Sequence, residues 1–81
     1  MSELKSKIIA IAQEYGKSVE SVYVGNGKVI YLNEIEKIIK FSHIADRNGY
    51  YSLKEKILDA CKGEIEKETS FQLRRECTIK F

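Results

Sequence analysis

The chain has 81 residues, of which 43% are hydrophobic and 32% charged, a composition typical of one small globular domain over residues 1–81 and unlike that of a disordered segment. Its 14 basic and 12 acidic residues are interleaved and leave a net charge of +2, which excludes a polybasic arm or an acidic tail. No apolar run approaches the roughly 18 residues that a membrane span needs, and the first residues lack the order of a signal peptide, so we expect a soluble, cytoplasmic protein with no membrane partner.

The first predicted element is an amphipathic helix over residues 3–15. Apolar side chains recur at intervals of three and four residues from Leu4 to Tyr15. Ser2 is the expected N-cap, and Gly16 follows at the position where a left-handed residue would end the helix.

Two strands, at residues 19–24 and 28–32, are then predicted to form a β-hairpin about Asn26 and Gly27. An Asn-Gly pair between β-branched and aromatic residues favours a type I′ turn, because that turn needs positive φ at both central positions. A two-stranded ribbon is marginal alone in water, so a third strand is expected beside it.

A second helix is predicted from residue 34 to about residue 45. Asn33 precedes Glu36 by three residues, a spacing at which the two side chains can cap the start of a helix reciprocally. The isoleucine side chains between Ile35 and Ile39 then share one helical face.

A cluster of turn formers, Asp-Arg-Asn-Gly at residues 46–49, is expected to end this second helix. A third helix begins at Ser52, which forms a capping box with Glu55, and apolar residues at helical spacing extend it to Ile65.

The last predicted element is a strand over residues 71–81, in which apolar and polar residues alternate. Arg75 breaks the alternation on the apolar side. Either its stem packs there while the guanidinium reaches the sheet margin, or it marks a bulge or a paired, functional arginine. A long strand at the end of the chain is expected at a sheet edge, where it could pair with a second copy in a homodimer or with another protein.

The predicted fold is therefore a single α+β domain with the order α-β-β-α-α-β, in which three helices pack on a roughly three-stranded antiparallel sheet. This element order resembles that of the prokaryotic-type KH domain, an RNA-binding fold that grips the nucleic-acid backbone with a GXXG loop between two consecutive helices. The corresponding residues 46–51 hold one glycine and no GXXG motif. The resemblance is one of order alone, and it implies RNA binding as an alternative function.

Residues 8–25 suggest a second alternative function, because they can also be arranged as a helix-turn-helix unit. Ala12, Gly16 and Val22 have the spacing of the small helix residue, the turn glycine and the buried recognition-helix residue of such units. Strand-forming residues at positions 19–24 oppose this arrangement. In it, the DNA contacts would come from Lys17, Ser18, Glu20 and Ser21.

No arrangement of residues predicts an enzyme or a metal site. His43 is the only histidine, and it falls on one predicted helix together with Ser42 and Asp46, so we expect a packing histidine. Cys61 and Cys77 lack the close spacing of zinc ligands and are expected as reduced thiols. We therefore expect a non-catalytic protein with no cofactor and no metal.

The candidate binding residues are arginines and tyrosines. Arg47 lies near Tyr50 and Tyr51 on a predicted surface loop, and both residue types are enriched at binding hot spots, although tyrosines there also pack on core margins. Arg74 and Arg75 of the last strand complete the set. The sequence thus favours a small regulator or inhibitor that binds a protein partner through a sheet edge and this Tyr/Arg loop, with nucleic acid as the alternative partner.

Overall fold

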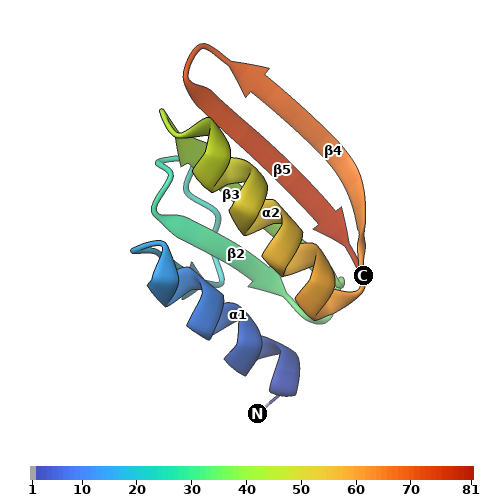
Figure 1. Cartoon of the computed structure of the whole chain (residues 1–81). Helices are drawn as coiled ribbons and strands as arrows, with labels where there is room; N and C mark the ends of the chain where they lie inside the picture. The colour runs from blue at the N-terminus through green and yellow to red at the C-terminus, as the bar shows by residue number, and fades with distance from the viewer. Residues whose placement is uncertain (1) are drawn as a thin grey trace.

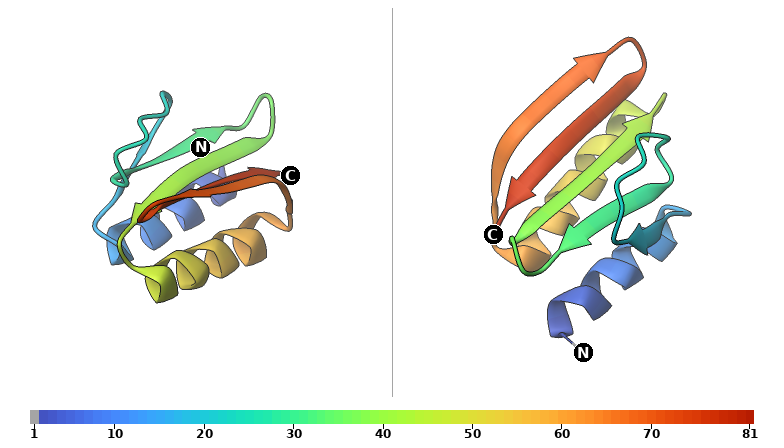
Figure 2. Two further views of the ribbon diagram at one scale, coloured as in Figure 1. Left: turned by 90° about the horizontal axis from the view of Figure 1, so that it is seen from above. Right: turned by 180° about the vertical axis from the view of Figure 1, so that it is seen from behind.

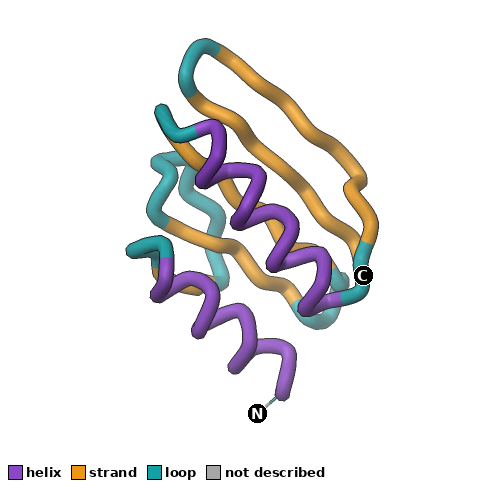
Figure 3. The backbone as a smooth tube through the Cα atoms, viewed as in Figure 1, coloured by secondary structure: helices purple, strands orange, loops and turns teal. Residues whose placement is uncertain are grey.

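Residues 2–81 are described by the computed structural model, and they fold into two helices and five strands (Figures 1 and 3). The domain is α+β, as predicted, but three helices on a three-stranded sheet in the order α-β-β-α-α-β is wrong. In chain order the elements are α1 (Glu3–Glu14), β1 (Ser18–Glu20), β2 (Val29–Asn33), β3 (Ile38–Ile44), α2 (Arg47–Cys61), β4 (Glu64–Phe71) and β5 (Arg74–Lys80).

The strands form one mixed sheet in the spatial order β1-β2-β3-β5-β4. β1 runs parallel to β2, and each of the other neighbouring pairs is antiparallel. Both helices lie on one face of the sheet, which we call the helix face, and neither covers the other, the open face (Figure 2). Two edges follow from this order: the short β1 and the longer β4.

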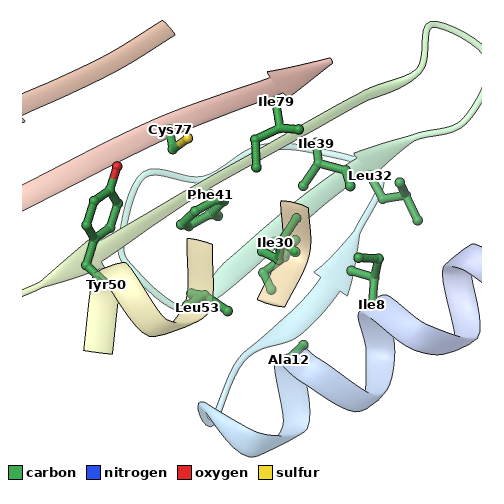
Figure 4. Packing of buried hydrophobic residues seen from close by; sticks show 11 residues of the cluster. Ile8, Ala12, Ile30, Leu32, Ile39, Phe41, Tyr50, Leu53, Cys77 and Ile79 are labelled. Carbon is green, nitrogen blue, oxygen red and sulfur yellow. The ribbon is translucent and has the colours of Figure 1, made fainter. Parts of the chain in front are cut away.

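The hydrophobic core fills the space between the two helices and the helix face of the sheet (Figure 4). Each strand of the sheet centre contributes alternate residues to it, as a strand with one buried face must. Its buried apolar side chains are Ile8, Ala12, Ile30, Leu32, Ile39, Phe41, Tyr50, Leu53, Ile57, Cys77 and Ile79. No side chain of β4 belongs to this core, so β4 is held to the domain by other contacts.

The helix α1 confirms the first predicted element. Ser2 caps it, since the Ser2 hydroxyl accepts a hydrogen bond from the backbone N–H of Lys5 at 3.0 Å. Gly16 follows the helix with a φ of 65°, the left-handed conformation expected at that position.

The predicted hairpin about Asn26 and Gly27 is wrong, because β1 and β2 are parallel and the chain crosses between them. A type I′ turn needs positive φ at both central residues, and of these two only Gly27 has it, at 78°. Asn26 instead accepts the backbone N–H of Lys28 through its side chain and closes a local turn. The second predicted strand, at residues 28–32, is confirmed as β2.

The crossing segment, residues 21–28, lies over the open face of the sheet (Figure 2). Gly27 donates its backbone N–H to the hydroxyl of the buried Ser42 at 3.0 Å. The amine of the buried Lys17 donates to the carbonyl oxygen of Gly27 and, at 3.4 Å, to that of Ser42. These bonds fasten the crossing segment to β3, so this part of the open face is covered.

The predicted second helix is wrong, because β3 occupies most of that stretch. The Asn33 side chain does accept the backbone N–H groups of Ile35 and Glu36, but the turn that it closes ends at Lys37, whose φ is 61°. An Asx turn of this kind begins a hairpin as readily as a helix. The β-branched and aromatic residues that follow then favour pairing with β2 over a helix.

The predicted third helix exists as α2, but its bounds differ. It begins after Asp46, whose carboxylate accepts the backbone N–H of Gly49 at 2.9 Å, rather than at Ser52. It ends where Lys62 takes a left-handed φ of 55° and donates its N–H to the carbonyl of Leu58. The residues after this point form β4, an element that the sequence does not predict.

The strand within the predicted range 71–81 is confirmed as β5, but its expected place at an edge is wrong. β5 pairs with β3 along one side and with β4 along the other. The strand that ends the chain is therefore interior to the sheet, and it offers no free edge for a homodimer.

Candidate functional site

Three of the five predicted binding residues meet on the helix face of the sheet, between the first half of α2 and the second half of β4. They line a shallow pocket of about 230 Å³, which we call the edge pocket. The remaining two, Arg47 and Arg74, do not line it. The residues of the edge pocket are Tyr50, Tyr51, Glu68, Thr69, Ser70 and Arg75.

Glu68 ties β4 to α2 across this pocket. Its carboxylate accepts hydrogen bonds from the hydroxyl of Tyr50 and, at 2.8 Å, from the amine of Lys54. The bond from Lys54 lowers the pKa of the Glu68 carboxyl, and the bond from Tyr50 acts in the same direction. Burial and the neighbouring Glu68 raise the pKa of Tyr50, which therefore stays a neutral donor.

The predicted surface loop with Arg47, Tyr50 and Tyr51 is wrong, because all three residues lie in α2. The two tyrosines point in different directions from the helix and have different roles. Tyr50 is 1% exposed and belongs to the core, so it is a packing residue with a bonded hydroxyl. Tyr51 is 47% exposed, and its ring lies edge-on against Tyr50 with the ring centroids 5.3 Å apart. The Lys54 amine lies 4.9 Å from the Tyr51 ring centroid. Tyr51 thus presents a fixed aromatic surface at the pocket.

Arg75 lies on the helix face of β5, where it alternates with the buried Cys77 and Ile79. It is half-buried, and its register partners are His43 on β3 and Ser70 on β4. No carboxylate among residues 2–81 lies within ion-pair distance of its guanidinium. No bulge occurs at Arg75. The pocket therefore holds one cation whose charge is not compensated by a neighbouring acid.

β4 forms one edge of the sheet, and all eight of its residues are exposed. Neither helix covers β4, because α2 lies over β3 and β5, and β4 lies beyond β5 (Figures 1 and 2). A register shift between Ile65 and Lys67 interrupts the regular pairing with β5, and Figure 3 shows the strand bending near its beginning. From Lys67 to Phe71 the pairing is regular.

An exposed apolar cluster lies where β4 ends. Phe71 and Leu73 are 69% and 67% exposed, and with Ile44 they line a depression of about 350 Å³ beside the turn between β4 and β5. Isolated exposed apolar residues are ordinary, but three that share one depression form a small contact surface. We call these three residues the apolar tip.

Arg74, another of the predicted binding residues, makes a contact within the domain. Its side chain lies on the open face, and its guanidinium donates to the carbonyl oxygen of Gly25 at 3.0 Å. On the same face, the Tyr23 hydroxyl donates to the Glu76 carboxylate, and burial raises the pKa of Tyr23 to about 12. Both contacts fasten the crossing segment to β5.

The residues proposed for DNA contact do not form a recognition helix, so that arrangement is wrong. Ser18 and Glu20 lie in β1, Ser21 follows it, and Lys17 is buried. The KH-like order is wrong as well, because a third strand takes the place of the first of the two consecutive helices. Neither nucleic-acid interpretation therefore has the element that it requires.

His43 faces the helix layer as a packing residue, but from a strand instead of a helix. Its Nε2 atom lies 3.5 Å from a carboxylate oxygen of Asp46, and its ring centroid lies 6.4 Å from that of Tyr15. Ser42 belongs to the same strand but points to the open face, where its hydroxyl accepts a hydrogen bond from the backbone N–H of Gly27. The three residues do not converge on one point, so they do not form a nucleophile, base and orienter.

A depression of about 440 Å³ lies between the two helices, but side chains from the two helices meet across it. Ile11 and Ala60 lie in its lining, and the amine of Lys56 pairs with the Glu14 carboxylate at 2.9 Å between the helices. This pair is exposed and contributes little to stability. Each charged side chain that lines the depression has an ion-pair partner within residues 2–81.

No family model matches the chain, and comparison with curated proteins and with solved structures finds no match. Within residues 2–81 no three His, Cys, Asp or Glu side chains gather closely enough to hold a metal ion. Over the same residues, no helix is long and apolar enough to cross a membrane.

Sequence reasoning missed the β4 residues of the site, namely Glu68, Thr69 and Ser70. The stretch from Glu64 to Ser70 contains one apolar residue, so it has neither the alternation of a half-buried strand nor the stripe of a helix. The signal that could have found it is the run of Thr69, Ser70 and Phe71 before a turn, followed by an alternating strand, which is the pattern of a hairpin.

Proposed function

We propose that the protein is a small, non-catalytic cytoplasmic module that binds an extended segment of a partner protein, which adds to the sheet as a strand beside β4. It would act as a regulator or inhibitor by occupying that segment. The observation that carries the proposal is the free edge of β4. Among residues 2–81 no strand pairs with its outward backbone N–H and C=O groups, and all eight of its residues are exposed.

The second half of β4 is the part suited to this role. Proteins protect sheet edges with charges and bulges, and the first half of β4 has both, with Glu64, Glu66 and the register shift before Lys67. From Thr69 to Phe71 the edge is regular and uncharged. The edge pocket and the apolar tip both adjoin this unprotected half.

A protein segment fits this edge better than a nucleic acid does. A sheet edge alternates donors and acceptors along its backbone, and only another peptide backbone matches both with the same repeat. A nucleic acid would need a continuous basic surface, whereas the exposed charges of β4 are of both signs and the whole chain carries only +2.

The test uses peptides selected on the wild-type protein from a displayed library of random sequences. Amide hydrogen exchange is then measured for the protein with and without a selected peptide. In an antiparallel edge strand, successive residues point their N–H groups alternately toward the neighbouring strand and outward. We expect the peptide to slow exchange at every second residue between Lys67 and Phe71. Protection that is confined to other surfaces, or an absence of enriched peptides, would overturn the proposal.

The matched controls are Thr69→Pro and Ser70→Pro. Because these neighbours alternate in direction, one proline removes an outward N–H and the other removes a hydrogen bond to β5. The variant that loses only an outward N–H is expected to be the more stable of the two, so thermal unfolding identifies it. That variant should keep the fold and lose the peptide, whereas unchanged binding by it would contradict addition at this edge.

A further inference from the structure

We infer that the segment bound at β4 carries an aspartate or glutamate that pairs with Arg75, next to a large apolar residue that packs on Phe71. This inference rests on the proposed function, and it adds the chemistry by which the edge would select its partner. It combines the uncompensated arginine of the edge pocket with the exposed ring at the end of the strand.

The charge inside the edge pocket is positive. The Glu68 carboxylate already accepts bonds from Lys54 and Tyr50, so its charge is compensated within the domain. Arg75 has no such partner among residues 2–81, and its guanidinium nitrogens stay accessible at the pocket, so the charge is open to an incoming group. A carboxylate from the partner is the group that an arginine fork binds most strongly.

The geometry of an added strand brings such a carboxylate within reach. Ser70 is the β4 residue directly opposite Arg75, so both side chains point to the helix face. A partner residue placed opposite Ser70 would lie two strand spacings, about 10 Å, from the backbone of Arg75. The small Ser70 side chain leaves the space between them open. A glutamate or aspartate and Arg75 can therefore meet over Ser70, beside the exposed ring of Tyr51.

The neighbouring residue of the partner would point to the open face, because side chains alternate along a strand. There it would lie opposite Phe71, whose ring is 69% exposed and which shares the apolar tip with Ile44 and Leu73. Burying a large apolar side chain against this ring is favourable in water. The partner pattern is thus an acidic residue adjacent in sequence to a large apolar one.

The experiment compares peptide selections from one random library on three proteins: wild type, Arg75→Gln and Arg75→Glu. Arg75 lies outside the core, so circular dichroism is expected to show that all three fold. We expect acidic residues beside large apolar ones on wild type, no charge preference on Arg75→Gln, and lysine or arginine at the same position on Arg75→Glu. For a peptide selected on wild type, replacing its glutamate by glutamine should weaken binding by about ten- to a hundredfold.

The apolar half of the pattern has its own variant, Phe71→Ser. This exposed position should tolerate the change, keep the selected acidic residue and lose the apolar neighbour. If the charge preference is the same on wild type and on Arg75→Glu, while hydrogen exchange still shows alternate protection of β4, the inference about the carboxylate is wrong and the proposed function stands. If no protection appears at β4, the proposed function itself fails.

Discussion

At the scale of single residues, His43 lies in an environment that disfavours its charged form. Its Nδ1 atom is buried and, among the described residues, has no hydrogen-bond partner. Burial lowers the pKa of His43, the charge of the nearby Lys17 lowers it further, and Asp46 raises it in part. Because the folded pKa lies below that of an unfolded histidine, the protein loses stability as the pH falls below about 6.5.

We therefore expect an NMR titration of the His43 ring to give a midpoint below about 6.5. Two variants should move it in opposite directions. Lys17→Met removes a neighbouring positive charge and should raise the pKa of His43, whereas Asp46→Asn removes a favourable partner and should lower it. Asparagine also caps helices, so α2 should keep its first turn. A wild-type midpoint above 6.5, or shifts of the same sign in both variants, would contradict this account of the site.

At the scale of elements, the contacts that matter most are those that hold β4, since this strand adds no side chain to the core. Glu68 is its anchor to α2, and the pKa of its carboxyl is lowered chiefly by Lys54. A lowered folded pKa stabilises the protein above the unfolded value of about 4.3, and this stability is lost as the pH falls through the folded value.

Glu68→Gln should therefore unfold with a weaker pH dependence than wild type between about pH 5 and pH 3, as measured by denaturant titrations across that range. The glutamine oxygen still accepts the bond from Tyr50, and the ion pair with Lys54 is partly exposed, so we expect a loss below about 1 kcal/mol at neutral pH. Glu66→Gln is the matched control, because Glu66 makes no ion pair within residues 2–81. If both variants titrate alike, Glu68 is no anchor.

Elements with complete local signals were predictable from the sequence. The helix α1 has a cap, an apolar stripe and a stop, and β2 and β5 have β-branched or alternating residues. The structure of the stretch after Asn33 was not predictable, because the same Asx turn can begin a helix or a hairpin. Which of the two forms depends on whether β2 is present as a pairing partner. Residue propensities alone do not show whether that partner strand is present.

The candidate site was half predictable for a similar reason. Tyr51 and Arg75 stand out as an aromatic and a cation in unusual positions, and the structure places both at one pocket. The β4 residues that complete the pocket do not stand out in the sequence. An edge strand that is exposed along its whole length does not need alternating apolar and polar residues. Arg47 stands close to the two tyrosines in the sequence and Arg74 stands next to Arg75, but near neighbours in a helix or strand point in different directions, and neither arginine lines the pocket.

At the scale of the whole molecule, the two sheet edges differ in what they can recruit. β1 has three residues, lies beside α1 and is too short to hold another strand on its own. β4 is long enough, and a homodimer that continues the sheet would have to use it, since β5 is interior. Symmetry limits how two copies of β4 can pair.

We expect the protein to be a monomer in sedimentation experiments at tens of micromolar. An antiparallel two-fold pairing places one residue opposite its own copy, and the registers that align most of β4 place Lys67 opposite Lys67 or Glu68 opposite Glu68. Like charges in these positions are destabilising. Lys67→Thr removes one of these barriers, so this variant should dimerise more readily than wild type. A wild-type dimer that Lys67→Thr leaves unchanged would show that a second copy already occupies the edge, and that charge does not prevent it.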